Sequence, residues 1–279
     1  MSYTPADGGF AKYFCSMLDD ADRNKIYGEG IKACIDDFQK RENRAPRVLD
    51  VGVGTGMLSG LCIFHGAKHV TGVDVNPTMT SLAKESLRKV DPTGKKFTVK
   101  LVKPGASQLG EAKFDMLVSE ILGTLTTSES MYKYIAIYQH HLNTFGDEQR
   151  VYCVPRKTVQ YFAVHSFDRA ELGHSLSSAL EHAVSSTEAA RKLVPTNEGG
   201  LGLHLPQYMH QSEAIGERLA IHTETYDRLS PNPLNGKLAF GVEGLGQTVQ
   251  LESAHLGAAE TRLNLGIFEW EVEVTRACI

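Results

Sequence analysis

The chain has 279 residues, of which 42% are hydrophobic, and a formal net charge of −4 at pH 7. These values predict a globular protein of one large or two smaller domains, and they give no electrostatic case for nucleic-acid binding, which asks for a basic face. The five cysteines form no Cys-x-x-Cys pair, so we expect neither a disulfide framework nor a zinc site. Neither a targeting pattern nor a run of roughly 20 apolar residues is present, and we therefore expect a soluble intracellular protein.

The first predicted element is a helical region over residues 19–39, where Ile26, Ile31, Ile35 and Phe38 recur at nearly helical spacing. Short apolar runs follow, as expected for strands buried on both faces, at residues 47–51, 69–73, 97–102 and 114–118. Helices predicted at residues 57–65 and 77–90 separate the earlier runs. This alternation of strand and helix predicts a parallel α/β sheet.

A glycine-rich turn follows the first predicted strand, in the run Leu49-Asp50-Val51-Gly52-Val53-Gly54-Thr55-Gly56. Glycines there allow a tight turn and the close approach of a ligand, and Asp74, 22 residues after Gly52, can accept hydrogen bonds from ribose hydroxyls. Met57 breaks the G-x-G-x-x-G form, which disfavours NAD, whereas D-x-G-x-G-x-G fits S-adenosylmethionine. The alternative is a plain strand-to-helix loop with Asp74 as a helix cap.

Two glutamates, Glu120 and Glu129, lie nine residues apart between the fourth predicted strand and a helix. One carboxylate accepts paired hydrogen bonds from a guanidinium, and a second can bind the remaining donors of the same group. The pair therefore predicts an arginine substrate, the alternative being two solvated surface glutamates. We interpret His140 and His141 as a solvated helix face, since no acidic or cysteine partner lies at ligand spacing, and we expect no metal.

The second half of the chain differs from the first in its pattern of apolar and polar residues. After Pro155 we predict β-rich segments at residues 158–165, 219–226, 237–242, 247–252 and 263–275. Between the first two, a helical insert begins at Asp168 with an aspartate variant of the capping box, and Leu172, Leu176 and Leu180 form an apolar stripe. The stripe is expected to pack against this chain's own core or another subunit.

These residues together resemble the protein arginine methyltransferases. The turn at residues 50–56, the acid Asp74 and the pair Glu120 and Glu129 are similar to the family's cofactor turn, ribose acid and double-glutamate loop, and residues 17–27 look most like the monomethylating, type III branch. The resemblance implies that Glu120 and Glu129 are catalytic and that Arg23 binds the cofactor's carboxylate. The implied cofactor-binding residues are Phe14, Met17, Arg23, Asp50, Gly52, Gly54, Asp74 and Ser107, the last standing where the family often has an adenine-bonding acid.

The resemblance also implies the architecture and the partners. The expected fold is α/β: a helical segment at residues 1–45, a Rossmann-like S-adenosylmethionine-binding domain at 46–154, and a β-barrel substrate domain at 155–279 with a helical dimerisation arm at about 168–210. The expected partners are arginine-containing proteins, glycine–arginine-rich ones above all, and a second copy of the chain. We expect no membrane or direct nucleic-acid partner, and a cytoplasmic or nuclear location.

Two other functions compete with this interpretation. The family normally has a Thr-His-Trp loop late in the barrel, but none follows Trp270, the single tryptophan, which motivates a catalytically silent member that acts as scaffold or regulatory partner. A methyltransferase acting on RNA or a small molecule is the second alternative. Amino-base methylases carry an Asn/Asp-Pro-Pro-aromatic run after the fourth strand, where this chain has Ser119-Glu120-Ile121-Leu122, so that alternative is disfavoured.

Overall fold

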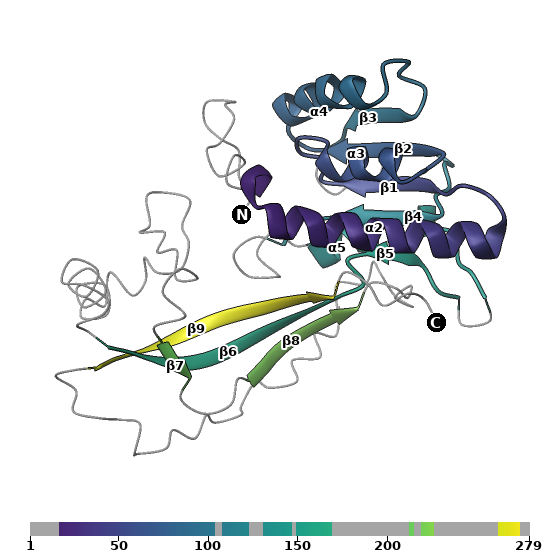
Figure 1. Ribbon diagram of the computed structural model, residues 1–279. Helices are drawn as coiled ribbons and strands as arrows, with labels where there is room; N and C mark the ends of the chain where they lie inside the picture. Colours follow the sequence, from purple (N-terminus) through teal and green to yellow (C-terminus); the bar gives the residue numbers. More distant parts are fainter. Residues whose placement is uncertain are drawn as a thin grey trace. The chain divides into compact units, whose positions relative to one another are not determined.

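The protein is described from a computed structural model (Figure 1). The structure describes residues 17–103, 108–122, 131–146, 149–168, 212–214, 219–225 and 262–273. The chain divides into two compact units. The first comprises residues 1–158, 224–240 and 272–279, and the second comprises residues 159–223 and 241–271.

A five-stranded parallel sheet forms the centre of the first unit. Its strands are β1 (Arg47–Val51), β2 (His69–Asp74), β3 (Phe97–Leu101), β4 (Met116–Ser119) and β5 (Tyr152–Val154), in the spatial order β3-β2-β1-β4-β5. The predicted parallel α/β sheet is therefore confirmed. Because the order reverses between β1 and β4, their carboxyl ends border the crevice in which such sheets bind ligands.

One helix precedes the first strand of this sheet and three follow its strands, and two of the four begin at a side-chain cap. They are α2 (Ala21–Glu42), α3 (Met57–Phe64), α4 (Pro77–Val90) and α5 (Met131–Tyr138), the last continued by a short 3-10 turn, η1 (Gln139–His141). Asp20 accepts a hydrogen bond from the Arg23 N–H at 3.0 Å at the start of α2, and Asn76 accepts from the N–H groups of Thr78 and Met79 at the start of α4. These side chains satisfy donors that the first turn leaves unpaired.

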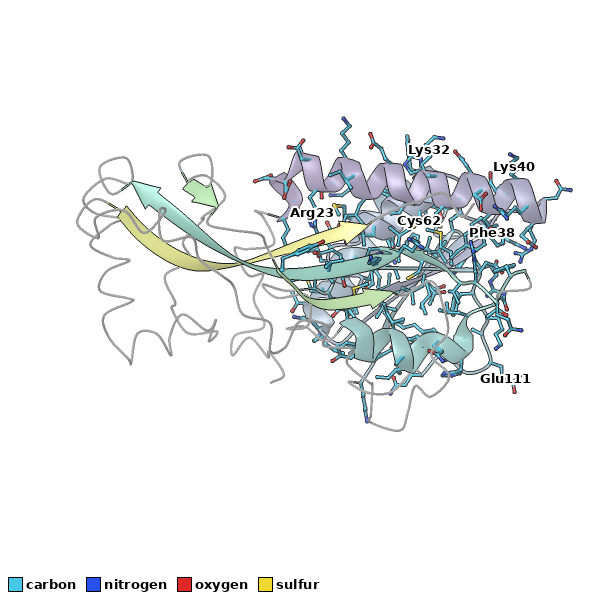
Figure 2. The ribbon with its side chains drawn as sticks, turned by 90° about the horizontal axis from the view of Figure 1, so that it is seen from below. Arg23, Lys32, Phe38, Lys40, Cys62 and Glu111 are labelled. Atoms are coloured by element: carbon cyan, nitrogen blue, oxygen red, sulfur yellow. The ribbon has the colours of Figure 1, made fainter. Side chains whose placement is uncertain are left out.

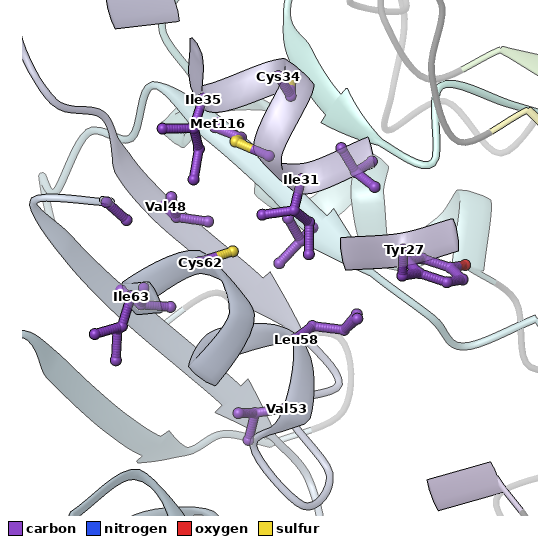
Figure 3. Packing of buried hydrophobic residues seen from close by; sticks show 14 of the residues in the cluster. Tyr27, Ile31, Cys34, Ile35, Val48, Val53, Leu58, Cys62, Ile63 and Met116 are labelled. Carbon is purple, nitrogen blue, oxygen red and sulfur yellow. The ribbon is translucent and has the colours of Figure 1, made fainter. Parts of the chain in front are cut away.

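Two hydrophobic cores lie on the two faces of the sheet. Alternate strand residues such as Val48 and Val118 pack with α2, α3 and α4, and Figure 3 shows Ile31, Ile35 and Cys62 in this core. The residues between them on the strands pack with α5, in a cluster that comprises Leu49, Val51, Val73, Leu117, Leu122, Met131, Ile135 and Tyr138 among others. Burial on both faces explains why the strands have nearly continuous apolar sequences.

A buried carboxylate, Asp115, joins three segments at the amino end of the sheet. Asp115 accepts two hydrogen bonds of 2.7 Å from the Arg44 guanidinium, one of 2.9 Å from the Arg47 N–H and one of 2.8 Å from the Asn143 amide. The guanidinium carbon of Arg44 also lies 4.9 Å from the centroid of the Phe38 ring. Burial alone would raise the pKa of Asp115, but these hydrogen bonds outweigh it and hold the pKa below its usual range.

The interpretation of His140 and His141 as one solvated face is wrong for His141. Helix α5 ends at Tyr138, and the 3-10 turn after it directs His141 into the protein, where it is 1% exposed. Its Nδ1 lies 2.9 Å from the Ala112 carbonyl, which can only accept, so Nδ1 carries the proton. Burial lowers the pKa of His141, partly opposed by this hydrogen bond.

The second unit is described only as strands. They are β6 (Lys157–Asp168), β7 (Ser212–Ala214), β8 (Leu219–Thr225) and β9 (Arg262–Glu273), of which β6, β8 and β9 each have two residues at one end in the first unit. β6 lies between β7 and β8 and also pairs with β9. The strands predicted at 158–165, 219–226 and 263–275 are confirmed, and β7 was missed.

Other predicted features of the second half lie outside the described residues. These are the segments at 237–242 and 247–252, and the arm at about 168–210 with its stripe of leucines, apart from its predicted first residue, Asp168, which the structure has as the end of β6. Closure of these strands into a barrel stays a prediction. Among the helices of the described residues, none has the length and apolar character needed to cross a membrane.

Candidate functional site

The turn after β1 depends on glycines in the left-handed region. Gly52, Gly54 and Gly56 have φ angles of 79°, 51° and 85°, which other residues adopt only with strain. The N–H groups of Gly52 and Val53 donate to the Val73 carbonyl at 2.9 and 3.0 Å, so the turn folds back onto the end of β2. Among the described residues, the Gly52 carbonyl alone lies within 4 Å of a Cβ added to Gly54, at 3.8 Å. A ligand can therefore approach the Gly54 backbone closely.

Asp74 ends β2 beside this turn. Its Oδ2 accepts a hydrogen bond from the Gly54 N–H at 2.9 Å, and its Oδ1 accepts one from the Asn76 N–H at 2.8 Å. Partial burial raises the pKa of Asp74, although the N–H groups of Asn76, Gly54 and Val75 oppose that rise. Because the two carboxylate oxygens have four lone pairs together, these three donors leave an acceptor position on Asp74 for a further ligand.

Asp50 is a buried carboxyl beneath the turn, 1% exposed. Its Oδ2 accepts a 2.6 Å hydrogen bond from the Ser59 hydroxyl, whereas its Oδ1 has no hydrogen-bond partner among the described residues. Burial raises the pKa of Asp50 to about 7, with the Ser59 hydrogen bond acting against the shift and the charge of Asp74 adding to it. Our sequence reasoning missed Ser59, although a lone hydroxyl in the apolar helix Met57–Phe64 was a usable signal.

Glu120 follows β4 at the point where the strand order reverses. The preceding residue, Ser119, is fully buried, and its hydroxyl donates to the Val51 carbonyl at 2.7 Å, which joins the ends of β4 and β1. The next residue, Ile121, contacts the glycine turn so closely that a Cβ on Gly52 would lie 2.4 Å from its Cγ2. Gly52 therefore makes room for Ile121 on its Cβ side, a reason for the glycine that the sequence pattern did not reveal.

Arg23 reaches Glu120 from the first turn of α2. Its Nη2 lies 2.6 Å from Oε2 of Glu120, and the two side chains are only 17% and 13% exposed. Its Nη1 donates to the Met17 carbonyl at 3.4 Å and to the Asn24 side chain at 3.2 Å, and the guanidinium carbon lies 5.6 Å from the centroid of the Tyr27 ring. Figure 2 shows Arg23 near the start of α2, with Phe38 and Lys40 near its end. The carboxylate predicted to bind a substrate guanidinium thus binds a guanidinium of its own chain.

The predicted site residues that the structure describes lie at the carboxyl end of the sheet. Arg23 and Glu120 form one group there, and the glycine turn with Asp74 and the buried Asp50 forms the other, joined to the first by Ile121 on Gly52. Met17 takes part through its main-chain carbonyl. Phe14, Ser107 and Glu129 lie outside the described residues. Within those residues, no cluster of metal-ligating side chains is found.

Comparison with known proteins identifies the chain's relatives. A methyltransferase domain profile matches residues 48–146. Protein arginine N-methyltransferase 7 of Drosophila ananassae is 29% identical over 170 residues, which cover 59% of this chain and 24% of that protein. Protein arginine N-methyltransferase 1 of Saccharomyces cerevisiae is 35% identical over 125 residues, covering 45% of this chain and 34% of that protein. The chain is thus similar to the protein arginine N-methyltransferases over part of its length, and residues 48–146 match a methyltransferase domain.

Structures of arginine methyltransferases have a similar fold. That of Trypanosoma brucei PRMT1, an enzyme–prozyme heterotetrameric complex with AdoHcy, matches with a TM-score of 0.57 and 20% identity, over 81% of this chain and 65% of that one. Arabidopsis thaliana protein arginine methyltransferase 10 matches with a TM-score of 0.53 and 18% identity, over 79% and 64%. In the sequence comparison, the match spans only about a quarter to a third of the two arginine methyltransferases.

Proposed function

We propose that the chain transfers a methyl group from S-adenosylmethionine to a terminal guanidino nitrogen of arginine in protein substrates. The observation that carries this proposal is the ion pair between Arg23 and Glu120. It supports the proposal because Glu120, at the carboxyl end of β4, lies where a guanidinium is bound beside the glycine turn. Sequence similarity to arginine methyltransferases supports the same reaction.

The residues around the turn fit the proposed cofactor. The Gly54 backbone is open to a ligand, Asp74 keeps an acceptor position for a ribose hydroxyl, and Asp50 has an unsatisfied buried oxygen beneath the turn. Arg23 offers a positive charge to the cofactor's carboxylate. Phe14, Met17, Gly52 and Ser107 complete the proposed cofactor set.

In the proposed reaction the two glutamates make arginine reactive. The arginine guanidinium is protonated and delocalised, with a pKa above about 12, and is therefore a poor nucleophile. Glu120 and Glu129 would bind it through different nitrogens, which draws positive charge onto one terminal nitrogen and leaves more lone-pair density on the other. S-adenosylmethionine supplies the methyl group on a sulfonium. Fixed carboxylates in a water-poor site lower the barrier by positioning and by balancing the charge of the methylated product.

A methylation assay with the isolated chain tests the proposal. Label should pass from tritiated S-adenosylmethionine to a glycine–arginine-rich peptide and not to a matched peptide with lysine in place of arginine. Monomethylarginine is the proposed product, on the similarity of residues 17–27 to the monomethylating branch, and mass spectrometry at early times would detect dimethylarginine if that assignment is wrong. A chain that binds the cofactor and labels no peptide would favour the alternative of a catalytically silent scaffold or regulatory partner.

Asp74→Ala should weaken S-adenosylhomocysteine binding by about 1 to 3 kcal/mol, because it removes a carboxylate acceptor from a partly buried site. The same change removes the hydrogen bond that holds Gly54 in the turn. Calorimetric titration of wild type and variant measures the difference. Asp91→Ala is a suitable control, since Asp91 also accepts hydrogen bonds from backbone N–H groups, those of Thr93 and Lys96. Equal affinities in wild type and Asp74→Ala would remove Asp74 from the cofactor site.

We also propose that the chain forms a two-fold homodimer through the helical arm at about 168–210, in a cytoplasmic or nuclear location. The apolar stripe Leu172, Leu176 and Leu180 supports this, because such a stripe needs a covering surface. Leu176→Asp should convert dimers into monomers in sedimentation velocity, whereas Glu171→Gln should not. Wild type that sediments as a monomer at micromolar concentration contradicts the arm's proposed role.

A further inference from the structure

The edge of the parallel sheet at β3 is strongly basic. Between residues 84 and 103 the sequence has seven basic residues and two acidic ones, in a chain whose formal net charge is −4. All seven cations are exposed, and none forms an ion pair with a described residue. These β3-edge cations are Lys84, Arg88 and Lys89 on α4, Lys95 and Lys96 before β3, Lys100 on β3 and Lys103 just after it.

The two acidic residues of this segment do not neutralise the cations. Asp91 is buried, and its carboxylate accepts hydrogen bonds from the N–H groups of Thr93 and Lys96 and from the Thr93 hydroxyl. Glu85 is exposed and takes part in none of the ion pairs of the described residues. A local excess of positive charge therefore remains on a chain that is acidic as a whole, and such a surface attracts an acidic partner.

The outer side of β3 offers main-chain groups that the sheet does not use. Among the described strands, β3 pairs with β2 alone. Two hydrogen bonds of 2.9 Å join the Lys96 carbonyl and the Val102 N–H to β2, so the even-numbered residues of this stretch bond to β2. Main-chain groups of successive residues point to opposite sides of a strand, and the outward ones belong to Phe97, Val99 and Leu101. They can pair with one more strand.

Both faces of this edge carry exposed groups. Side chains alternate along a strand, so Lys100 lies on the same face as Val102, which packs in the core with α5. Val99 packs with α4 on the other face, and Leu101, on that same face, is 51% exposed. Figure 1 shows α4 beside β3 at the edge of the sheet. An added strand would therefore meet Lys100 on one face and α4 on the other.

The cations of α4 lie on the flank of the helix away from α3. Val90 contacts α3, since its Cγ2 lies 3.6 Å from a Cβ built on Gly60. Arg88 is two residues before Val90 and so lies on nearly the opposite side of the helix, and Lys84 is about one turn before Arg88 on the same flank. These two cations and Lys100 thus border the β3 edge from its two faces.

An acidic strand fits this edge better than a second copy or a nucleic acid. Lysines on an edge strand keep identical edges apart by like-charge repulsion, but they attract a strand with carboxylates. Bases of a single-stranded nucleic acid need exposed aromatic rings to stack on. The one aromatic residue between positions 84 and 103 is Phe97, which packs against the core. A phosphate backbone also cannot pair with the outward main-chain groups of β3.

We propose that the β3 edge is a docking surface for an extended acidic segment of a partner protein, which adds to the sheet beside β3 and places its carboxylates among the β3-edge cations. Main-chain hydrogen bonds align the segment, as in other cases of strand addition. Because cations lie on both faces, the edge selects a run of consecutive acidic residues. This surface uses none of the residues assigned to the candidate site.

Fluorescence anisotropy of the full chain with three labelled probes tests the docking. The probes are a hexapeptide of alternating aspartate and glutamate, the same peptide N-methylated at every residue, and hexauridylate. The first should bind, with an affinity that falls as salt is added. N-methylation keeps the charge but removes every main-chain donor, so the second probe should bind about tenfold more weakly or less, and hexauridylate should do the same.

Lys100→Glu and Arg88→Glu should each weaken binding of the acidic hexapeptide by about threefold or more, because each turns an attraction on one face of the edge into a repulsion. Lys40→Glu is the matched control. Lys40 is an exposed lysine on α2, which packs against β5 at the opposite edge of the sheet, so this variant should keep the wild-type affinity. Unchanged Tm values check that all three variants fold.

Hydrogen exchange locates the bound peptide. The outward N–H groups of Val99 and Leu101 should exchange more slowly when the hexapeptide is bound, whereas those of α2 should not change. The proposal is overturned if the acidic peptide does not bind, if either other probe binds as tightly, if Lys40→Glu loses as much affinity as Lys100→Glu, or if β3 gains no protection. These measurements need neither cofactor nor arginine, so they stand apart from the test of methyl transfer.

Discussion

Glu120→Gln and Glu129→Gln should each lower the turnover of peptide methylation by about a hundredfold or more. Glutamine keeps the shape and some of the hydrogen bonding of glutamate but removes the negative charge. That charge is needed most when positive charge concentrates on one nitrogen of the guanidinium, which makes its loss a defect of the transition state rather than of binding. Initial rates with labelled S-adenosylmethionine at saturating peptide measure the effect.

Glu111→Gln is the matched control for both variants. Glu111 is exposed and precedes β4, at the end of the strand opposite Glu120, so the same substitution there should leave the rate unchanged. Wild-type turnover in either site variant would exclude the proposed role of that carboxylate.

Asp115→Ala should lower the free energy of unfolding by about 3 kcal/mol, or roughly 6 to 12 °C in Tm, because it leaves the groups around a buried carboxylate without their acceptor. Those groups are the Arg44 guanidinium, the Arg47 N–H and the Asn143 amide. Because half of the Arg44 side chain is exposed, we expect the loss of stability to lie at the lower end of the range observed when one partner of a buried ion pair is removed. Thermal and urea unfolding measure the change.

Asp36→Ala is the control for this variant, since its ion pair with Lys32 is exposed and such pairs contribute little. The pH dependence gives a second check. The pKa of Asp115 is lowered in the folded protein, so its contribution is present above about pH 4, the unfolded value, and is lost as the pH falls through the folded value. Equal acid sensitivity of wild type and Asp115→Ala would contradict this contribution.

Much of the first unit could be predicted from sequence because its strands are buried on both faces. The apolar run at residues 47–51 has the same limits as β1. The strand predicted at 114–118 begins two residues before β4, which starts at Met116. Phe114 instead forms an isolated bridge with Leu142, and Asp115 binds Arg44. The local sequence pattern indicates whether a residue is apolar or polar, but it does not indicate which distant segment of the chain that residue contacts.

The same limit applies to the candidate site. Strand ends and residue spacing placed Gly54 and Asp74 correctly at neighbouring positions, since the turn and the end of β2 are adjacent in any such sheet. The contact between Gly52 and Ile121 and the bond between Arg23 and Glu120 join segments far apart in the chain. No periodicity encodes such contacts. They follow from the order of the strands, which brings β4 next to β1.

Helix α2 carries an ion pair at each end, and the two differ in how firmly they hold. Beyond its last turn, Arg44 binds Asp115 through two hydrogen bonds on a carboxylate that two further donors also fix. At its first turn, Arg23 binds Glu120. At 1.5 Å per residue the two arginines are about 30 Å apart, so a rotation of roughly 2° about the Arg44 end moves Arg23 by about 1 Å. The Arg44–Asp115 ion pair at the amino end of the sheet and the packing of α2 on the core therefore help to fix the position of the Arg23 guanidinium at the carboxyl end, where a tilt of the helix would have its largest effect.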